Sequence, residues 1–220
     1  MYNACMPFEL PIFPLPTVLF PGMLLPLRIF EERYKEMLQV CLRERSPFGV
    51  ALIREGVAEY GPLPIPYSVG CTAHITQVQS LENGEFLIVV VGHRRFRILA
   101  LNEERPYLVG QVEAITHIPE STHHITKASA KLYPLVRQYV ELLAKTGGLD
   151  FDASQVPEDA PPLAYLAAAL LAVPEQKKQR WLESNRISHL LQLLIAAYTE
   201  ELKLLRLMPT NDETNIFSLN

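Results

Sequence analysis

The sequence lacks the short motifs by which many nucleotide-dependent and hydrolytic enzymes are detected. None of its 10 glycines is followed by lysine, which excludes the phosphate-binding loop of P-loop nucleotidases. The patterns G-x-G-x-x-G, H-E-x-x-H, C-x-x-C and G-x-S-x-G are absent too, so dinucleotide, zinc and serine-nucleophile signatures are missing. We therefore expect no catalytic residues, no cofactor and no metal, in a protein that is not an enzyme.

Cysteine and positive charge are also scarce. The three cysteines, Cys5, Cys41 and Cys71, have no paired spacing, which is typical of a reducing compartment. The net charge of −4 argues against a protein built mainly to bind nucleic acid. We see no signal-peptide pattern, and the apolar run Leu163–Val173 is too short to span a bilayer. The prediction is a cytoplasmic protein without a membrane segment.

What the sequence has instead is a long apolar stretch divided by proline. Leu10–Phe30 is almost wholly apolar, but it is interrupted at Pro11, Pro14, Pro16, Pro21 and Pro26. Each proline removes a backbone donor and fixes φ, so neither a long helix nor a long central strand can continue through this stretch. The pattern predicts short extended pieces at the start of an all-β domain: Phe8–Phe13, Val18–Phe20 and Met23–Leu27.

Helix-like and strand-like patterns follow. Apolar residues at helical spacing predict a helix over Phe30–Leu42. Strands are predicted over four later segments: Gly49–Arg54, Val69–Ser80, Glu85–Leu99 and Tyr107–Ile118. In the third of these, both faces are apolar before Gly92 and the pattern is amphipathic after it, so we expect a bulge or bend at this glycine. The alternation places Phe96 in the core.

The chain after Pro119 is helical in pattern. Four helices are predicted: Ile125–Ala144, Leu163–Ala172, Pro174–Leu182 and Ile187–Leu207. The prediction is therefore an α+β protein of two domains, a β-rich domain over residues 1–118 and a helical bundle over residues 119–220.

In the order and spacing of its blocks, the chain resembles the N-terminal domain of the ATP-dependent Lon protease, most closely the stand-alone bacterial proteins that carry this domain alone. The blocks are LPIFPLPTVLFPGMLLPLRIFEERYKEML, FGVALIREG, VGCTAHITQV and GEFLIVVVGHRRFRI. The resemblance extends from about Phe8 to Leu207 and implies a six-stranded PUA-like pseudo-β-barrel, with a helix inserted after the second strand and a C-terminal helical bundle. Two residues depart from the family: Cys71 stands where relatives often carry threonine, and His74 where a longer charged residue is common.

The resemblance implies a non-catalytic module that binds proteins or peptides, like the substrate-recognition domain of Lon but without its ATPase and peptidase modules. The implied partners are protein or unfolded-peptide clients and a separate ATP-dependent protease. An extended peptide can add to a free sheet edge by main-chain hydrogen bonds. In the proline-rich loop Gly61–Pro66 and just after it, Leu63, Ile65 and Tyr67 are the candidate peptide-binding residues. The oligomeric state is left open.

The basic segment His93–Arg97 supports an alternative hypothesis. PUA-like proteins include RNA-binding members, and arginine pairs well with phosphate, so Arg95 and Arg97 are candidate nucleic-acid-binding residues. The interpretation that we favour is a barrel strand whose arginines pair with nearby acids: Glu103, Glu104 and Glu113.

Two further clusters are interpreted as solvent-exposed. One is a group of histidines in the link between the two predicted domains: His117, His123 and His124. Their spacing matches no closed zinc motif. The other is a group of carboxylates on the predicted first helix: Glu31, Glu32 and Glu36. General acid–base chemistry requires a desolvated cleft, and nothing in the sequence predicts one there.

Overall fold

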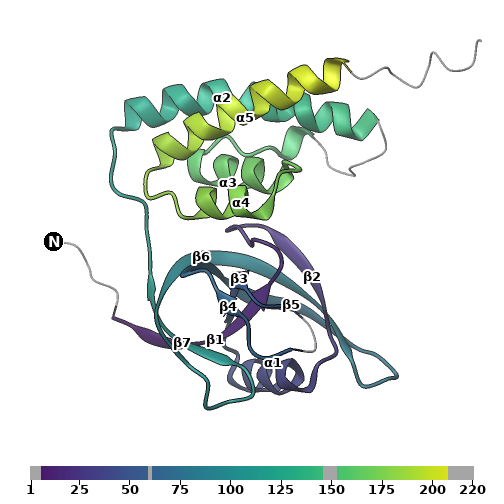
Figure 1. Ribbon diagram of the computed structural model, residues 1–220. Coiled ribbons are helices and arrows are strands. Elements are labelled where there is room, and N and C mark those ends of the chain that lie inside the picture. The colour runs from purple at the N-terminus through teal and green to yellow at the C-terminus, as the bar shows by residue number, and fades with distance from the viewer. Residues whose placement is uncertain (1–5, 59–60, 146–152, 208–220) are drawn as a thin grey trace, which may run out of the picture. The chain divides into compact units, whose positions relative to one another are not determined.

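The structure, a computed structural model, describes residues 6–58, 61–145 and 153–207 (Figure 1). Within these ranges it has seven strands and five α-helices, which confirms the α+β class. The strands are β1 (Phe8–Leu15), β2 (Leu24–Ile29), β3 (Phe48–Glu55), β4 (Ile65–Pro66), β5 (Val69–Ser80), β6 (Phe86–Asn102) and β7 (Leu108–Ala114). The helices are α1 (Glu32–Glu44), α2 (Thr122–Lys145), α3 (Ala160–Leu170), α4 (Glu175–Leu182) and α5 (Ile187–Leu207), with a short 3-10 turn at Ala153–Gln155.

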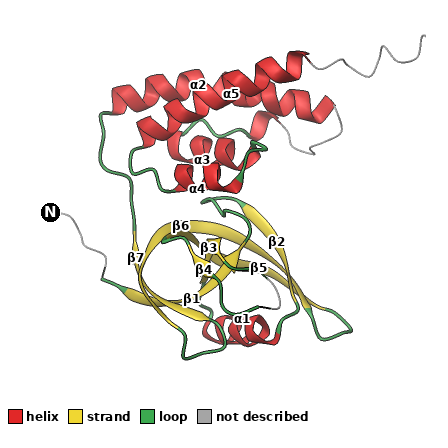
Figure 2. Cartoon of the chain, in the orientation of Figure 1, coloured by secondary structure: helices red, strands yellow, loops and turns green. Residues whose placement is uncertain are grey.

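Strand pairing closes the sheet on itself (Figure 2). The strand order is β1-β7-β6-β5-β3-β4, and β2 pairs with β6 outside this path. β1 pairs antiparallel with β7 and then, further along its length, parallel with β3. Because β1 has a partner on each side, the order returns to its start, as the expected pseudo-barrel requires. α1 lies between β2 and β3 in the chain, as predicted. The seventh strand is β4, a two-residue strand in the proline-rich loop.

Of the three short extended pieces that were predicted, the first and third correspond to β1 and β2, whereas Val18–Phe20 pairs with no described strand. It is a buried loop between β1 and β2. The backbone that follows it bonds to β6 instead: the Gly22 N–H donates to the Gly92 carbonyl at 2.8 Å, and the Gly92 N–H donates to the Met23 carbonyl at 2.9 Å. Pro16 and Pro21 on either side have no N–H to donate, and the Val18 N–H donates to the Glu175 carboxylate rather than to a strand.

The irregularity predicted at Gly92 is confirmed. A Cβ atom at this position would lie 2.2 Å from the carbonyl oxygen of Phe20, so only glycine fits. The pairing of β6 with β5 also shifts here, because Ala73 pairs with Gly92 whereas Cys71 pairs with Arg95. The one extra residue on β6 forms a bulge that changes which side chains face the core.

Two clusters of buried apolar side chains fill the space that the closed sheet encloses. The larger one joins strand residues to one face of α1, including Tyr34, Met37 and Leu38. The smaller one gathers around Phe96, which is fully buried as predicted, together with Ile12 and Leu108. The core position predicted for Phe96 is therefore confirmed, although Arg95 beside it is buried as well, on the opposite face of β6.

Contacts divide the chain into two compact units. The first joins Met1–Pro119 to Tyr165–Arg186, and the second joins Glu120–Ala164 to Ile187–Asn220. α4 and the C-terminal half of α3 therefore group with the strands, and a single domain boundary near residue 118 stays a prediction.

Within the first unit, polar contacts attach α4 to β5 and to the loop between β1 and β2. The Val18 N–H donates to the Glu175 carboxylate at 2.7 Å, and the Gln179 side-chain amide donates to the Val69 carbonyl at 3.0 Å. Residues 175 and 179 are four apart, so they lie on one face of the helix.

Within the second unit, α2 and α5 pack together. The rings of Tyr139 and Tyr198 meet edge to face, with centroids 5.2 Å apart. The Ser188 N–H in the first turn of α5 donates to Glu120 at 3.0 Å, which satisfies one of the unpaired donors at that helix start. In the described ranges, no helix has both the length and the hydropathy needed to cross a bilayer.

The burial of Phe96 gives a stability prediction. Phe96→Ala should lower the free energy of unfolding by about 3–5 kcal/mol, because it removes a buried ring and leaves a cavity. Leu99→Ala on the same strand is the control; Leu99 is 50% exposed, so its loss should be below about 0.5 kcal/mol. Urea denaturation followed by circular dichroism measures both. Equal stability of Phe96→Ala and the parent would show that the β6 register is wrong.

Candidate peptide-binding surface

Three strand segments form a ribbon with an apolar outer face. β2 pairs with residues 86–91 of β6, and the same part of β6 pairs with residues 74–80 of β5. The register places outer-face residues in three rows, each with one residue from β2, β6 and β5. The rows are Leu24, Val91 and His74; Pro26, Val89 and Gln77; and Arg28, Leu87 and Gln79. We call these nine residues the outer ribbon face.

Exposure separates the two faces of this ribbon. On the inner face, Ile88 and Val90 are almost completely buried in the core. On the outer face, Leu24 is 62% exposed and Leu87 is 40% exposed, and Val89 is only half-buried. Side chains of this kind are usually covered when both faces of an antiparallel strand are apolar. An exposed apolar cluster rimmed by polar side chains is typical of an interaction site.

The margins of the ribbon can also bind a chain. Within the described residues, β2 pairs with β6 and with no other strand, so its other margin is unpaired. β5 pairs with β3 only through Cys71–Ala73. Residues 74–80 of β5 therefore pair with β6 on one side and with no described strand on the other. Unpaired strand margins can accept an extended chain through main-chain hydrogen bonds. Pro26 limits this on β2, because proline has no N–H to donate.

One end of the outer ribbon face is basic. The rings of His74 and His93 meet edge to face, with centroids 4.9 Å apart. Arg94 follows at the bulge, where its N–H donates to Thr72 Oγ1 at 3.0 Å. Burial, together with the nearby His93 and Arg94, lowers the pKa of His74. His74 is therefore mostly neutral at pH 7, and Arg94 supplies the positive charge.

The other end of the outer ribbon face is internally neutralised. Arg28 forms an ion pair with Glu85, which lies just before β6. The hydrogen bond from Arg28 lowers the pKa of the Glu85 carboxyl. The two ends of this surface thus differ in charge at neutral pH.

Arg95 does not have the role that the alternative hypothesis gave it. Its side chain is buried, with only 3% of the residue exposed. The guanidinium donates to the backbone carbonyls of Leu182 and Ser184 at 2.8 and 2.6 Å. A guanidinium in this position cannot reach a phosphate, which contradicts the prediction that Arg95 contacts nucleic acid. The expected pairing with an acid is also wrong for Arg95, because its partners are carbonyls.

Arg97 behaves as the favoured interpretation predicted. Its guanidinium forms an ion pair with Glu113 at 3.3 Å, and both side chains are partly exposed. Its candidacy as a nucleic-acid contact stays an untested prediction.

His117 is not a solvent-exposed linker residue, contrary to its interpretation. Its Nε2 lies 2.7 Å from the hydroxyl oxygen of Tyr165, and its Nδ1 lies 3.3 Å from the Arg95 guanidinium. Burial raises the pKa of Tyr165, so that hydroxyl stays protonated and can donate. His117 therefore belongs to a polar network in the first unit. His123 and His124 are exposed, as expected.

The three candidate peptide-binding residues occupy different environments. Ile65 on β4 is exposed, whereas Leu63 packs against the cluster around Phe96. Tyr67 is half-buried, and its N–H donates to the Leu52 carbonyl at 2.8 Å. Ile65 is the one of these three that presents a largely open apolar side chain. Their role in peptide binding stays a prediction.

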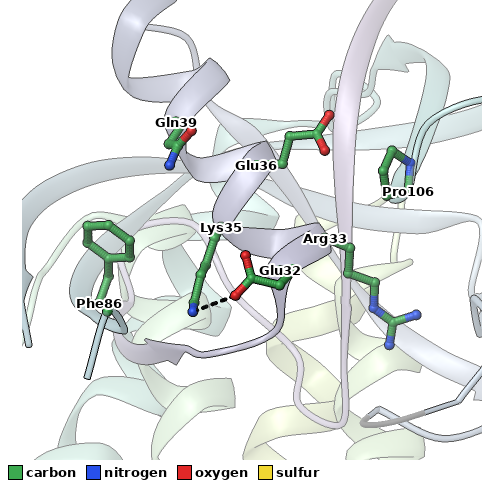
Figure 3. A pocket seen from close by; sticks show the side chains of 8 residues that line it. Glu32, Arg33, Lys35, Glu36, Gln39, Phe86 and Pro106 are labelled. Carbon is green, nitrogen blue, oxygen red and sulfur yellow. Dashed lines mark hydrogen bonds and ion pairs between the residues drawn. The ribbon is translucent and has the colours of Figure 1, made fainter.

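A wide pocket of about 590 Å³ borders α1 (Figure 3). It is lined by charged and polar residues of this helix, with Phe86 and Pro106 on its rim. Figure 3 shows the Lys35 ammonium joined to the Glu32 carboxylate, at 2.8 Å. The Glu32 side chain is 88% exposed, which confirms the solvent-exposed interpretation for this carboxylate. Glu31 differs, because it is mostly buried and paired with Arg33 at 2.7 Å.

The described residues contain no group of three or more histidines, cysteines or carboxylates arranged to hold a metal ion. The buried thiols are also poor ligands, because burial raises the pKa of Cys41 to about 11 and that of Cys71 to about 12. Metal ligation requires the thiolate form.

The fold and this surface define an α+β domain of the pseudo-barrel class, with an apolar ribbon face open to solvent. The family model of the ATP-dependent protease La (LON) substrate-binding domain matches residues 9–198, and the chain belongs to this family.

Full-length relatives and solved structures agree with this assignment. The Lon protease of Anaeromyxobacter dehalogenans is 28% identical over 203 residues, which cover 91% of this chain and 24% of that protein. The Lon protease of Paraburkholderia phytofirmans is 29% identical over 212 residues, which cover 93% of this chain and 26% of that protein. The chain thus spans about a quarter of the length of these relatives.

Among solved structures, the Lon N-terminal domain protein from Xanthomonas campestris has a TM-score of 0.63 and 25% identity, covering 86% of this chain and 98% of that one. The N-terminal domain of a Mycobacterium avium complex Lon protease has a TM-score of 0.68 at 19% identity. The match covers 88% of this chain and 99% of that one, and it shows that the two share a fold.

Sequence reasoning did not single out the apolar residues of the outer ribbon face as a site. The signal was present in β6, whose residues before Gly92 are apolar on both faces. In an antiparallel strand, a second apolar face indicates that something covers it, or that it binds something. The contribution of β2 could not be read in this way, because its register with β6 comes only from the structure.

The buried position of Arg95 gives a second stability prediction. Arg95→Met should lower the free energy of unfolding by about 2–4 kcal/mol, because one buried and one partly buried carbonyl lose a charged donor. Arg97→Met is the matched control and should cost below about 1 kcal/mol, since its ion pair is partly exposed. Chemical denaturation measures both variants. Equal losses would mean that the two arginines have the same environment.

Proposed function

We propose that the chain is a non-catalytic module that binds extended apolar segments of unfolded proteins on its outer ribbon face. The observation that carries this proposal is the apolar cluster exposed on β2 and β6, which includes Leu24 and Leu87. Burying a fully exposed leucine side chain is worth about 1.5–3 kcal/mol, and Leu24 and Leu87 still have 62% and 40% of their surface to bury. Two or three of them therefore supply useful affinity without a deep pocket.

The strand margins support an extended rather than a folded client. A segment added beside residues 74–80 of β5 can form main-chain hydrogen bonds whatever its sequence. Its alternate side chains would extend the three rows of the outer ribbon face, next to His74, Gln77 and Gln79 on β5. Unfolded chains expose both their backbone and apolar residues, whereas folded proteins expose few such segments together.

The family and the length of the relatives support a role in proteolysis. The matched family is a substrate-binding domain, and its full-length relatives are named Lon proteases. We propose that this chain passes bound clients to an ATP-dependent protease and performs no hydrolysis itself. Purified chain should therefore bind unfolded protein without ATP turnover or peptide cleavage.

The surface can be tested by paired substitutions. A Leu24→Ser, Leu87→Ser double variant should bind a fluorescently labelled unfolded protein, such as reduced and carboxymethylated lactalbumin, at least fivefold more weakly than the parent. Fluorescence anisotropy measures the affinities. Leu42→Ser is the matched control, because Leu42 on α1 is 40% exposed, as Leu87 is, and lies outside the ribbon.

The control decides how the result is interpreted. Retained binding by Leu42→Ser with loss in the double variant supports the outer ribbon face as the site. Equal binding by all three proteins places the site elsewhere and contradicts the proposal. Absence of binding by the parent itself would remove the client-binding function.

A further inference from the structure

The outer ribbon face is asymmetric in charge along its length. At one end Arg28 is neutralised by Glu85, and at the other Arg94 is exposed beside His74 and His93. Within the described residues, no ion pair is recorded for Arg94. The apolar side chains of the three rows, those of Leu24, Pro26, Leu87, Val89 and Val91, lie along the ribbon from one end to the other.

The backbone at the bulge places this charge beside the apolar rows. His93 and Arg94 are consecutive and both exposed, which breaks the strand alternation. Thr72 Oγ1 accepts from the Arg94 N–H at 3.0 Å and donates to the Arg94 carbonyl at 3.3 Å. The buried Thr72 thus fixes the backbone from which the Arg94 side chain extends.

The distance from the apolar rows to the basic end suits one short peptide. Residues 87 to 91 of β6 span about 13 Å at the usual rise of a strand. A strand that lies on this face along β6, with apolar residues at three alternating positions, would cover the three rows. The next outward-facing residue of that strand, two positions further, would lie beside the row of His93.

We propose that the outer ribbon face selects apolar segments that carry a carboxylate just beyond the apolar run, with Arg94 as the residue that contacts it. This inference rests on the proposed function, since it names the client class of the same surface. Charge complementarity identifies the occupant: an acidic residue gains attraction at the Arg94 end, whereas lysine there is repelled. The effect on affinity is modest, because exposed ion pairs are weak.

Capped peptides with the full chain test this preference. Each peptide has nine residues, apolar side chains at three alternating positions, and Glu, Gln or Lys two positions beyond the last one. A second series carries the variable residue before the apolar run, so that both chain directions are tested. In one series, Glu should bind about two- to fivefold more tightly than Gln, and Lys more weakly than Gln.

The arginine is tested by two variants with the same change of charge. Arg94→Gln should abolish the preference for Glu over Gln. Arg43→Gln should retain it, because Arg43 is a 71% exposed arginine on α1, outside the ribbon. Raising the salt to about 0.5 M should shrink the preference in the parent, because exposed charges are screened.

The outcomes separate the two proposals. If the Gln peptides bind and Glu gives no gain in either series, or if Arg94→Gln keeps the preference, the acidic-client inference is wrong while the apolar surface stands. If no peptide binds the parent, both are overturned.

Discussion

The buried guanidinium of Arg95 is the contact on which the arrangement of the first unit depends. A charged side chain with 3% exposure is tolerated only when its donors are satisfied. The last carbonyls of a helix have no partner within the helix. The carbonyl of Leu182, at the end of α4, and that of Ser184 just after it accept the Arg95 donors. The guanidinium and the two carbonyls therefore satisfy one another, so neither carries the free-energy cost of a buried polar group without a partner.

The same interaction explains why β6 has two different halves. Before Gly92, β6 lies between β2 and β5, with one face in the core and the other exposed. After the bulge, β6 lies between β5 and β7, and Arg95 and Phe96 are both buried, on opposite faces. One face is filled by the Phe96 cluster, and the other is covered by the end of α4. The exposed apolar face is therefore confined to the half before the bulge.

This division separates a buried, stabilising half of the strand from the exposed half that we propose as a binding surface. The half that carries Arg95 and Phe96 holds the unit together. The outer face of the other half contributes little to the core and stays exposed, as the proposed client-binding function requires. A binding surface of this kind depends on residues that stay uncovered in the folded protein, which is why it is apolar and exposed at once.

The sequence alone determined the elements and the family. Proline spacing predicted short first strands, helical periodicity predicted α1 and α5, and alternation placed Phe96 in the core, because these patterns depend on local geometry with fixed periods. The tertiary structure decided the partners. Arg95 binds carbonyls about ninety residues away, His117 joins Tyr165, and β2 aligns its apolar residues with β6. No local period encodes such contacts, since they depend on which distant segments the closed sheet and α4 bring together.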